Sequence, residues 1–322
     1  MTNPATLTFP TPDSPLKIGT RGSPLALAQA HETRDRLMEA FDLPEAAFHI
    51  EVIATTGDNR QMIDADRPLK EIGNKGLFTK EIEEAMLRGD IDVAVHSTKD
   101  MPTEQPEGLA LETFLPREDV RDAFISLKYG SISELPAGAK VGTSSLRRRA
   151  QLLRKRPDLD VVEFRGNVQT RLTKLSDDVA DCSFLAMAGL TRLDMLDKVT
   201  SAIEPDEMLP AVAQGAIGLE CRVDDSLAQH MLSAIHDEET GWRVRCERAF
   251  LRALDGSCET PIAALSEIDG PEIHLRGEIL RPDGSDCLEI EGRALLSGAE
   301  DLGRELGEEL LALAPAGFFD LT

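Results

Sequence analysis

Short apolar runs and amphipathic stretches alternate along the first two thirds of the chain. The apolar runs at residues 92–95, 123–127, 184–188 and 217–219 are typical of buried strands. Stretches with helical spacing, such as residues 77–87, lie between them. Strands that are apolar on both faces are typical of parallel sheets covered by helices. The pattern therefore predicts an α/β architecture.

A unit of strand, tight polar loop and helix occurs three times, at residues 17–38, 140–156 and 161–175. In the first unit, Ser23 is the expected N-cap and Pro24 takes the first helical position. Such a loop directs backbone N–H groups and the positive end of a helix dipole at one point, so each loop can bind an anion. Each of the three also supplies an Arg. The repeated units indicate two α/β domains.

The pattern changes after about residue 238. The expected elements there are a helix over 240–254, a hairpin of 273–280 and 287–294 turned at 282–284, and a helix that ends at Leu313. We therefore expect a smaller α+β domain with an antiparallel sheet. The predicted organisation is a disordered leader over 1–15, a first α/β domain over 16–115 and 216–237, a second over 116–215, and a third, α+β domain over 238–322.

Charge is distributed unevenly along the chain. Residues 140–174 hold ten Lys and Arg against three acids, a net charge of +7, which leaves −30 on the rest of a chain whose net charge is −23. Like charges gathered in this way repel each other unless an anion neutralises them, so this basic segment predicts an anion-binding surface. The alternative interpretation is a helix whose Arg side chains only solvate one face.

Composition excludes several classes of protein. Nucleic-acid binders pair a basic groove with aromatic platforms, whereas this chain is 4% aromatic and strongly acidic outside the basic segment. No apolar run is long enough to span a membrane, and the polar start does not read as a signal peptide. Five cysteines without a CxxC pair argue against a disulfide framework and against a thiolate metal site. We expect a cytoplasmic protein without a metal.

The apolar strand near residue 95 ends in His96-Ser97-Thr98-Lys99-Asp100. Ligands of open α/β sheets bind beyond the carboxyl ends of strands, which makes Asp100 a candidate functional carboxylate. An ordinary turn carboxylate is the equal alternative. A His at the end of a strand, such as His96, is more often a hydrogen-bonded structural residue than a catalytic one.

The cysteines differ in their expected surroundings. Cys246 falls on an apolar helix face, and Cys182 and Cys221 neighbour apolar strands, so all three should be buried and inert. Cys258 lies in a Gly-Ser loop and should be exposed enough to react. Cys287 is the rival, because it alternates with glutamates on the polar face of its strand.

Seven segments together resemble the porphobilinogen deaminase family, also called the hydroxymethylbilane synthases. They are GTRGSPLAL at 19–27, TTGD at 55–58, GNKGLFTKE at 73–81, VHSTKDMP at 95–102, GTSSLRR at 142–148, RGNV at 165–168 and GSCETPI at 256–262. The resemblance covers roughly residues 16–315, in order and with the family's spacing. The small departures at Thr98 and Glu259 touch none of the residues assigned a role.

The resemblance implies an activity and a cofactor. Family members condense four porphobilinogen molecules into a linear tetrapyrrole and release ammonia at each step. Chain growth is primed by a dipyrromethane cofactor, joined through a thioether to the loop cysteine, here Cys258. Twelve carboxylates on up to six pyrroles would explain a cleft lined with Arg, because guanidinium groups pair with carboxylates through two hydrogen bonds.

The resemblance also implies roles for single residues. Asp100 would be the catalytic carboxylate. The cofactor would be held by Cys258, Ser97, Lys99, Ser145, Arg147, Arg148 and Gln214. The substrate carboxylates would be held by Arg21, Ser23, Lys75, Arg165, Arg171 and Arg192. The implied fold has two doubly wound domains like those of periplasmic binding proteins, plus the cofactor-bearing third domain, and residues 58–75 would be a mobile lid.

A second interpretation is a protein with two α/β lobes that binds an anion without catalysis. It explains the Arg-bearing loops but gives no reason for Cys258 or Asp100. We expect a monomer that acts on porphobilinogen, with no nucleic-acid or membrane partner.

Overall fold

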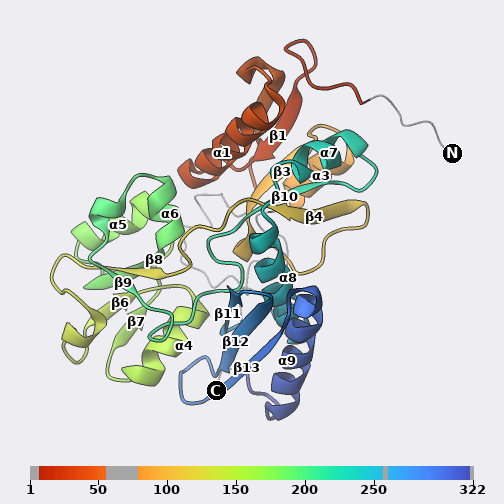
Figure 1. Ribbon diagram of the computed structural model, residues 1–322. Coiled ribbons are helices and arrows are strands. Elements are labelled where there is room, and N and C mark those ends of the chain that lie inside the picture. Colours follow the sequence, from red (N-terminus) through yellow and green to blue (C-terminus); the bar gives the residue numbers. More distant parts are fainter. Residues whose placement is uncertain (1–6, 56–78, 257–259, 320–322) are drawn as a thin grey trace. The chain divides into compact units, whose positions relative to one another are not determined.

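The computed structural model describes residues 7–55, 79–256 and 260–319 (Figure 1). These residues form two compact units. Unit 1 contains residues 7–55, 79–116 and 217–241, and unit 2 contains residues 117–216, 242–256 and 260–319. No helix of the described part is long and apolar enough to cross a membrane.

Unit 1 is a mixed sheet with helices on both faces. Its strands are β1 (Leu16–Thr20), β2 (Phe48–Val52), β3 (Val93–Ser97), β4 (Leu109–Phe114) and β10 (Ile217–Arg222), and its helices are α1 (Pro24–Phe41), α3 (Lys80–Leu87) and α7 (Ser226–Ser233). The sheet order is β2-β1-β3-β10-β4. Strands β1, β2 and β3 run parallel, whereas β10 is antiparallel to both of its neighbours.

The alternation of side chains along β3 separates two apolar clusters in unit 1. Val93 and Val95 pack with Leu37 of α1 on one face of the sheet. Ala94 packs with Met86 of α3 on the other face. Because successive strand residues point to opposite faces, the five residues of β3 contribute to both layers.

Unit 2 contains a second mixed sheet of the same kind. Its strands are β5 (Asp122–Ile125), β6 (Lys140–Gly142), β7 (Asp160–Val162), β8 (Cys182–Ala186) and β9 (Ser201–Ile203), and its helices are α4 (Leu146–Lys155), α5 (Val168–Ser176) and α6 (Met187–Arg192). The order is β7-β6-β8-β5-β9, with β6 parallel to β7 and β8. Strand β5 is antiparallel to both neighbours, as β10 is in unit 1.

Unit 2 also contains an antiparallel sheet of β11 (Ile262–Asp269), β12 (Glu272–Leu280) and β13 (Cys287–Leu295). Helices α8 (Glu238–Ala253) and α9 (Ala299–Leu313) lie beside this sheet (Figure 1). Helix α8 packs closely against β12 and against α9. A Cβ on Gly277 of β12 would lie 2.4 Å from the Phe250 ring of α8, and one on Gly303 of α9 would lie 2.0 Å from the Cys246 carbonyl oxygen of α8. Single 3-10 turns complete the fold: η1 (Glu45–Ala47), η4 (Thr98–Asp100), η5 (Ile132–Glu134), η6 (Leu196–Lys198) and η7 (Leu296–Gly298).

A buried carboxylate on α8 ties several segments of unit 2 together. Glu247 pairs with Arg117 and accepts hydrogen bonds from the Ser266 amide and hydroxyl of β11 at 2.9 and 2.8 Å. It also accepts one from the Ala213 amide at 2.7 Å. The antiparallel sheet is thereby joined to the segments that flank the mixed sheet of unit 2.

The architecture confirms the expected fold class of two α/β sheets and a smaller antiparallel sheet. The sheets are mixed rather than wholly parallel, since β10 and β5 run against their neighbours. Apolar runs predict strand burial but not strand direction, which explains the difference. The expected second and third domains fall within a single unit here.

Residues 7–15 of the leader that was expected to be disordered make specific contacts in unit 1. Thr11 and Ser14 exchange two backbone hydrogen bonds. Phe9 packs beside Phe41 of α1 and His230 of α7, with ring centroids 5.4 and 6.0 Å away. The prediction of disorder was therefore wrong for residues 7–15, because one aromatic side chain anchors this polar segment.

Candidate active site

One edge of the unit 1 sheet gathers several of the predicted site residues. Strands β1 and β3 are parallel neighbours, so the loops that follow them leave the sheet at the same edge. The loop after β1 carries Arg21 and Ser23, and the turn after β3 carries Lys99 and Asp100.

The loop after β1 folds as its sequence predicts. The Ser23 hydroxyl accepts a hydrogen bond from the Ala26 amide at 3.2 Å, and Pro24 begins α1. This confirms the predicted N-cap. Helix α1 also joins the second loop, since Gln29 Nε2 donates to the Ser97 hydroxyl at 2.9 Å.

Asp100 closes the 3-10 turn η4. The turn is held by a hydrogen bond from the Met101 amide to the Thr98 carbonyl at 3.1 Å. Thr98 is buried, Lys99 is half-buried and Asp100 is exposed. The catalytic candidate therefore stands at the surface on a turn whose first residue is anchored inside the fold.

An equivalent edge of the unit 2 sheet carries the second group. Strands β6, β7 and β8 are parallel, so the loops after them share one edge. The Ser145 hydroxyl caps α4 by accepting from the Arg148 amide at 3.4 Å. The Asn167 side chain caps α5 by accepting from the Thr170 amide at 2.9 Å. The N-termini of α4 and α5, which can bind anions, therefore both lie at this edge of the sheet.

Arg147 and Arg148 share a buried carboxylate. Arg147 Nη2 and Arg148 Nη2 each lie 2.7 Å from an oxygen of Asp122, the first residue of β5. Their Nη1 atoms donate to the Leu209 carbonyl at 2.7 Å and the Phe184 carbonyl at 2.8 Å. Burial alone would raise the pKa of Asp122, but the two guanidinium groups hold it well below its usual range. The trio keeps one excess positive charge.

The other predicted residues of unit 2 lie around the same segments. Gln214 Nε2 donates to Asp122 Oδ1 at 2.9 Å. Arg171 Nε donates to the Gly166 carbonyl at 2.9 Å, and Arg192 Nη2 to the Gly215 carbonyl at 3.1 Å. The Arg165 side chain is 14% exposed, 3.8 Å from a Glu163 oxygen. Its Nε has no hydrogen-bond acceptor among the described residues.

Two predicted site residues and the predicted lid lie outside the described residues. They are Lys75, Cys258 and residues 58–75. The other cysteines match their predicted surroundings, since Cys182, Cys221 and Cys246 are buried and Cys287 is partly exposed.

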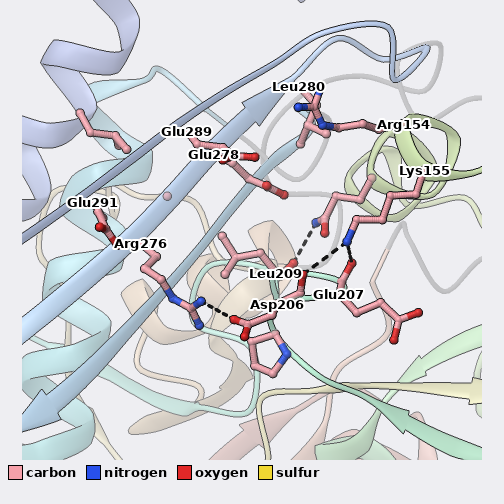
Figure 2. A pocket seen from close by; sticks show the side chains of 14 residues that line it. Arg154, Lys155, Asp206, Glu207, Leu209, Arg276, Glu278, Leu280, Glu289 and Glu291 are labelled. Carbon is pink, nitrogen blue, oxygen red and sulfur yellow. Dashed lines mark hydrogen bonds and ion pairs between the residues drawn. The ribbon is translucent and has the colours of Figure 1, made fainter.

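Unit 2 also contains a cavity of about 540 Å³ that the sequence did not suggest (Figure 2). It is lined by the C-terminal part of α4, strands β12 and β13, and residues 205–209. Arg154 and Lys155 of α4 lie on one side of it, and Glu278 and Glu289 of the antiparallel sheet lie on the other. Arg276, on β12 like Glu278, pairs with Asp206 at 2.6 Å. The caps of α4 and α5 do not line this cavity, so it is a different place from the edge described above.

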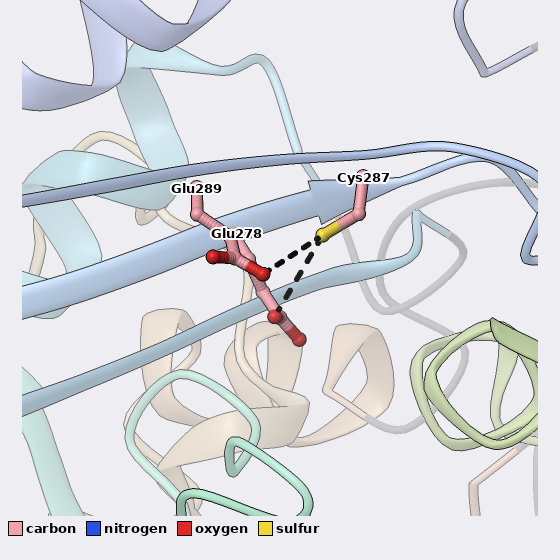
Figure 3. Close-up of side chains that lie close together, drawn as sticks. All are labelled: Glu278, Cys287 and Glu289. Atoms are coloured by element: carbon pink, nitrogen blue, oxygen red, sulfur yellow. Dashed lines mark hydrogen bonds between the residues drawn. The ribbon is translucent and has the colours of Figure 1, made fainter. Parts of the chain in front are cut away.

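Glu278 and Glu289 stand directly opposite each other on β12 and β13. The Cys287 thiol lies 3.9 Å from Glu278 and 3.8 Å from Glu289 (Figure 3). Burial and the negative charge of Glu289 raise the pKa of Glu278 to about 7. Burial and Glu278 raise the pKa of Cys287 to about 12. Burial and a like charge directly opposite both disfavour the ionised form of Glu278.

The basic segment is not a uniformly solvated helix face. Arg154 is exposed, whereas Arg156 donates to the Ile132 and Leu135 carbonyls at 3.0 and 2.8 Å. Asp122 was missed altogether. Its one signal was an acid at the start of an apolar run.

Two family models match the chain. Residues 16–230 match "Porphobilinogen deaminase, dipyromethane cofactor binding domain", and residues 242–312 match "Porphobilinogen deaminase, C-terminal domain". Together they include both units.

Similar proteins carry the same name. The porphobilinogen deaminase of Paracoccus denitrificans (strain Pd 1222) is 62% identical over 97% of this chain and 98% of its own length. The chloroplastic porphobilinogen deaminase of Pisum sativum is 53% identical over 95% of this chain and 83% of its length. Among solved structures, the methionine binding protein MetQ aligns with a TM-score of 0.42 and 14% identity, over 71% of this chain and 93% of that chain. On the sequence matches, the chain belongs to the porphobilinogen deaminase family.

Proposed function

We propose that this chain is a hydroxymethylbilane synthase in which Asp100 is the catalytic carboxylate and Cys258 carries a covalent dipyrromethane cofactor. The reaction is one step of tetrapyrrole biosynthesis: it joins four porphobilinogen molecules head to tail and releases one ammonia for each molecule that it adds. The family match, at 62% identity over 97% of the chain, supports the activity. The arrangement of Ser, Arg and Asp at strand ends supports the residue roles.

The described residues fit a ligand that carries several carboxylates. Arg147, Arg148 and Arg165 each have a buried Nε without an acceptor in the described part of the chain. An unpaired buried donor costs about 1–3 kcal/mol, which a carboxylate would recover. When bound, the dipyrromethane supplies the free pyrrole α-carbon at which chain growth begins. These donors are the single observation that supports the cofactor most directly.

The proposed binding residues fall into two groups, according to the molecule that each would bind. Ser97, Lys99, Ser145, Arg147, Arg148 and Gln214 are proposed to hold the cofactor with Cys258. Arg21, Ser23, Lys75, Arg165, Arg171 and Arg192 are proposed to hold the acetate and propionate of porphobilinogen. Arg147 and Arg148 would act through their remaining N–H groups, since Asp122 orients both guanidinium groups.

Asp100 suits the charge that develops on the substrate. When the aminomethyl carbon of porphobilinogen loses ammonia, positive charge spreads over its pyrrole ring. A carboxylate close to the pyrrole N–H stabilises that charge. A carbon–carbon bond then forms at the free α-carbon of the growing chain, which must release a proton. The same carboxylate can accept this proton, because Asp100 is exposed at the end of η4.

The intact mass of purified protein tests this function. We expect a mass above that of the sequence by two linked pyrrole units. Cys258→Ala should remove the added mass, and Cys287→Ala is the matched control. Cys287 should not react, because its thiol pKa of about 12 leaves little thiolate at neutral pH. An unmodified mass in freshly purified, active protein would falsify the proposal.

A cytoplasmic monomer is proposed as the working form. The free thiols of Cys182, Cys221, Cys246 and Cys287 support a reducing compartment. Light scattering of the purified protein tests the monomer, and cell fractionation tests the compartment. A two-lobed anion receptor without catalysis would share the Arg-bearing loops, but it would not release ammonia from porphobilinogen.

A further inference from the structure

A buried polar cluster lies on the unit 1 sheet next to the turn that carries Asp100. It consists of His96, Glu220, Glu83 and Thr98, whose exposed fractions are 6%, 0%, 9% and 1%. Three of these groups are ionisable, and no step of the reaction described above uses them. Burying ionisable groups lowers the free energy of unfolding unless they are well paired, so we expect these groups to have a role that compensates for that loss of stability.

The strand register brings two of these groups together. His96 on β3 stands opposite Gly218 on β10, and Glu220 stands opposite Ala94. His96 and Glu220 are therefore diagonal neighbours on one face, with Nε2 and Oε2 3.1 Å apart. Gly218, opposite His96, leaves room for Thr98, since a Cβ there would lie 2.9 Å from the Thr98 hydroxyl.

Glu83 extends the cluster from α3. Burial and the negative charge of Glu220 raise the pKa of Glu83. Glu220 Oε1 has no hydrogen-bond partner among the described residues, so the hydrogen bond between Oε2 and His96 is what anchors this side chain there.

The turn is also held on the opposite face of the sheet. Ser97 exchanges hydrogen bonds with Gln29 of α1 at 2.9 and 3.2 Å. Thr98 is buried, and its carbonyl closes the turn by accepting from Met101. Contacts on both faces of the unit 1 sheet therefore fix the backbone that leads from His96 to Asp100. These contacts lie only a few bonds from the exposed carboxylate.

We propose that His96 and Glu220, supported by Glu83, are positioning residues that hold the Asp100 turn in its catalytic geometry. The inference rests on the role of Asp100 proposed above. A displacement of a reacting group by about 1 Å can lower a rate by about 10²-fold. A loosened turn should therefore lower kcat while substrate binding, which uses other residues, changes little.

The test combines single and double variants of the full-length, cofactor-loaded enzyme. Glu220→Leu should lower kcat at least tenfold with KM within about twofold, and Glu220→Gln, which keeps the hydrogen bond, should restore most of kcat. His96→Gln should resemble Glu220→Gln. Leu37→Ala, a core change in the same unit, is the control: it should lower the thermal midpoint and leave kcat of the folded enzyme unchanged.

A double-mutant cycle separates this inference from the role of Asp100. If Glu220 acts through Asp100, Glu220→Leu should have no further effect on kcat in an Asp100→Asn background. Additive losses would overturn the positioning role, as would an equal loss of kcat in Leu37→Ala. Near-normal activity of Asp100→Asn alone would instead overturn the function assigned to Asp100. If Glu220→Leu does not fold, Glu220→Gln and His96→Gln complete the same cycle.

Discussion

Arg117 and Glu247 form a buried ion pair with two parallel hydrogen bonds, from Nη1 to Oε1 at 2.7 Å and from Nη2 to Oε2 at 2.9 Å. The side chains are 3% and 0% exposed. Glu247 also receives N–H and O–H groups from β11 and from Ala213. The pair thus joins the antiparallel sheet to the segments that flank the mixed sheet of unit 2 through a single carboxylate.

Glu247→Gln should destabilise the protein strongly. It keeps the shape of the side chain but removes the charge that pairs with Arg117, and breaking a buried ion pair typically costs about 3–5 kcal/mol. Denaturant unfolding followed by circular dichroism measures the loss. The control is Asp301→Asn, which removes an exposed ion pair on α9 and should change stability by less than about 1 kcal/mol. Equal midpoints for the two variants would contradict the role of Glu247.

Asp100→Asn should lower turnover by about 10²-fold or more, the scale of losing one preorganised electrostatic group. Stability should change little, because Asp100 is exposed. Steady-state product formation and the thermal midpoint are the measurements. Glu104→Gln, which removes another exposed carboxylate four residues away, should be nearly silent. Turnover near that of the wild type in Asp100→Asn would move the catalytic role elsewhere.

Arg165→Leu should impair elongation, whereas Arg154→Leu should not. Arg165 is largely buried, its Nε has no hydrogen-bond acceptor in the described part of the chain, and loss of an enclosed charge partner costs about 2–5 kcal/mol. Arg154 is exposed, where a charge contributes about 0–1 kcal/mol. Mass spectrometry of enzyme-bound intermediates compares the two. Identical elongation profiles would mean that the basic segment serves solubility only.

Arg147→Leu and Arg148→Leu should impair cofactor loading and also lower stability, because either change leaves Asp122 with one buried guanidinium instead of two. Intact mass of the folded fraction measures loading, and thermal unfolding measures stability. Full loading of both variants would show that these arginines serve only to neutralise Asp122.

Glu278 should make stability depend on pH. Its pKa is raised from 4.5 to about 7 in the folded protein, so the folded state binds this proton more tightly than the unfolded state. Stability from this group is therefore present below about pH 4.5 and is lost as the pH rises to about 7. Glu278→Gln should stabilise the protein at pH 8 by roughly 2–3 kcal/mol, and much less at pH 5.

Denaturant unfolding at the two pH values measures this difference. Glu291→Gln is the control, since Glu291 is exposed on β13 and should not change the pH dependence. Glu289→Gln should weaken the dependence, because the charge of Glu289 helps to raise the pKa of Glu278. A Glu278→Gln variant with the same pH profile as the wild type would be inconsistent with this assignment.

The features of the fold that depend on interactions between residues close together in the sequence were predictable. The cap at Ser23 and the hairpin of β12 and β13 follow from capping and alternation, and both formed as expected. Strand direction at β10 and β5 was not predictable, because it depends on which strands meet after long excursions of the chain. The order of residues 7–15 depends on the packing of Phe9, which a polar composition conceals.

Strand ends and the family resemblance predict Ser145, Arg165 and Asp100 as site residues. The structure places each of them in a segment that follows a parallel strand, and their roles stay predictions. Partner choice was not predictable, since Asp122 reaches Arg147 and Arg148 only through the pairing of β5 with β8, which places it beside Ala186 at the loop edge. The raised pKa of Glu278 likewise depends on a cross-strand register.

The position of β10 sets an order for folding during synthesis. This strand lies between β3 and β4, so residues 16–114 cannot complete their own sheet when they leave the ribosome. They must wait until about a hundred more residues have emerged, including every strand of the mixed sheet in unit 2. The mixed sheet of unit 2 can therefore close first, although unit 1 contains the N-terminal strand. The nascent chain has an unpaired strand edge at β3 throughout that interval, which is where a chaperone would act.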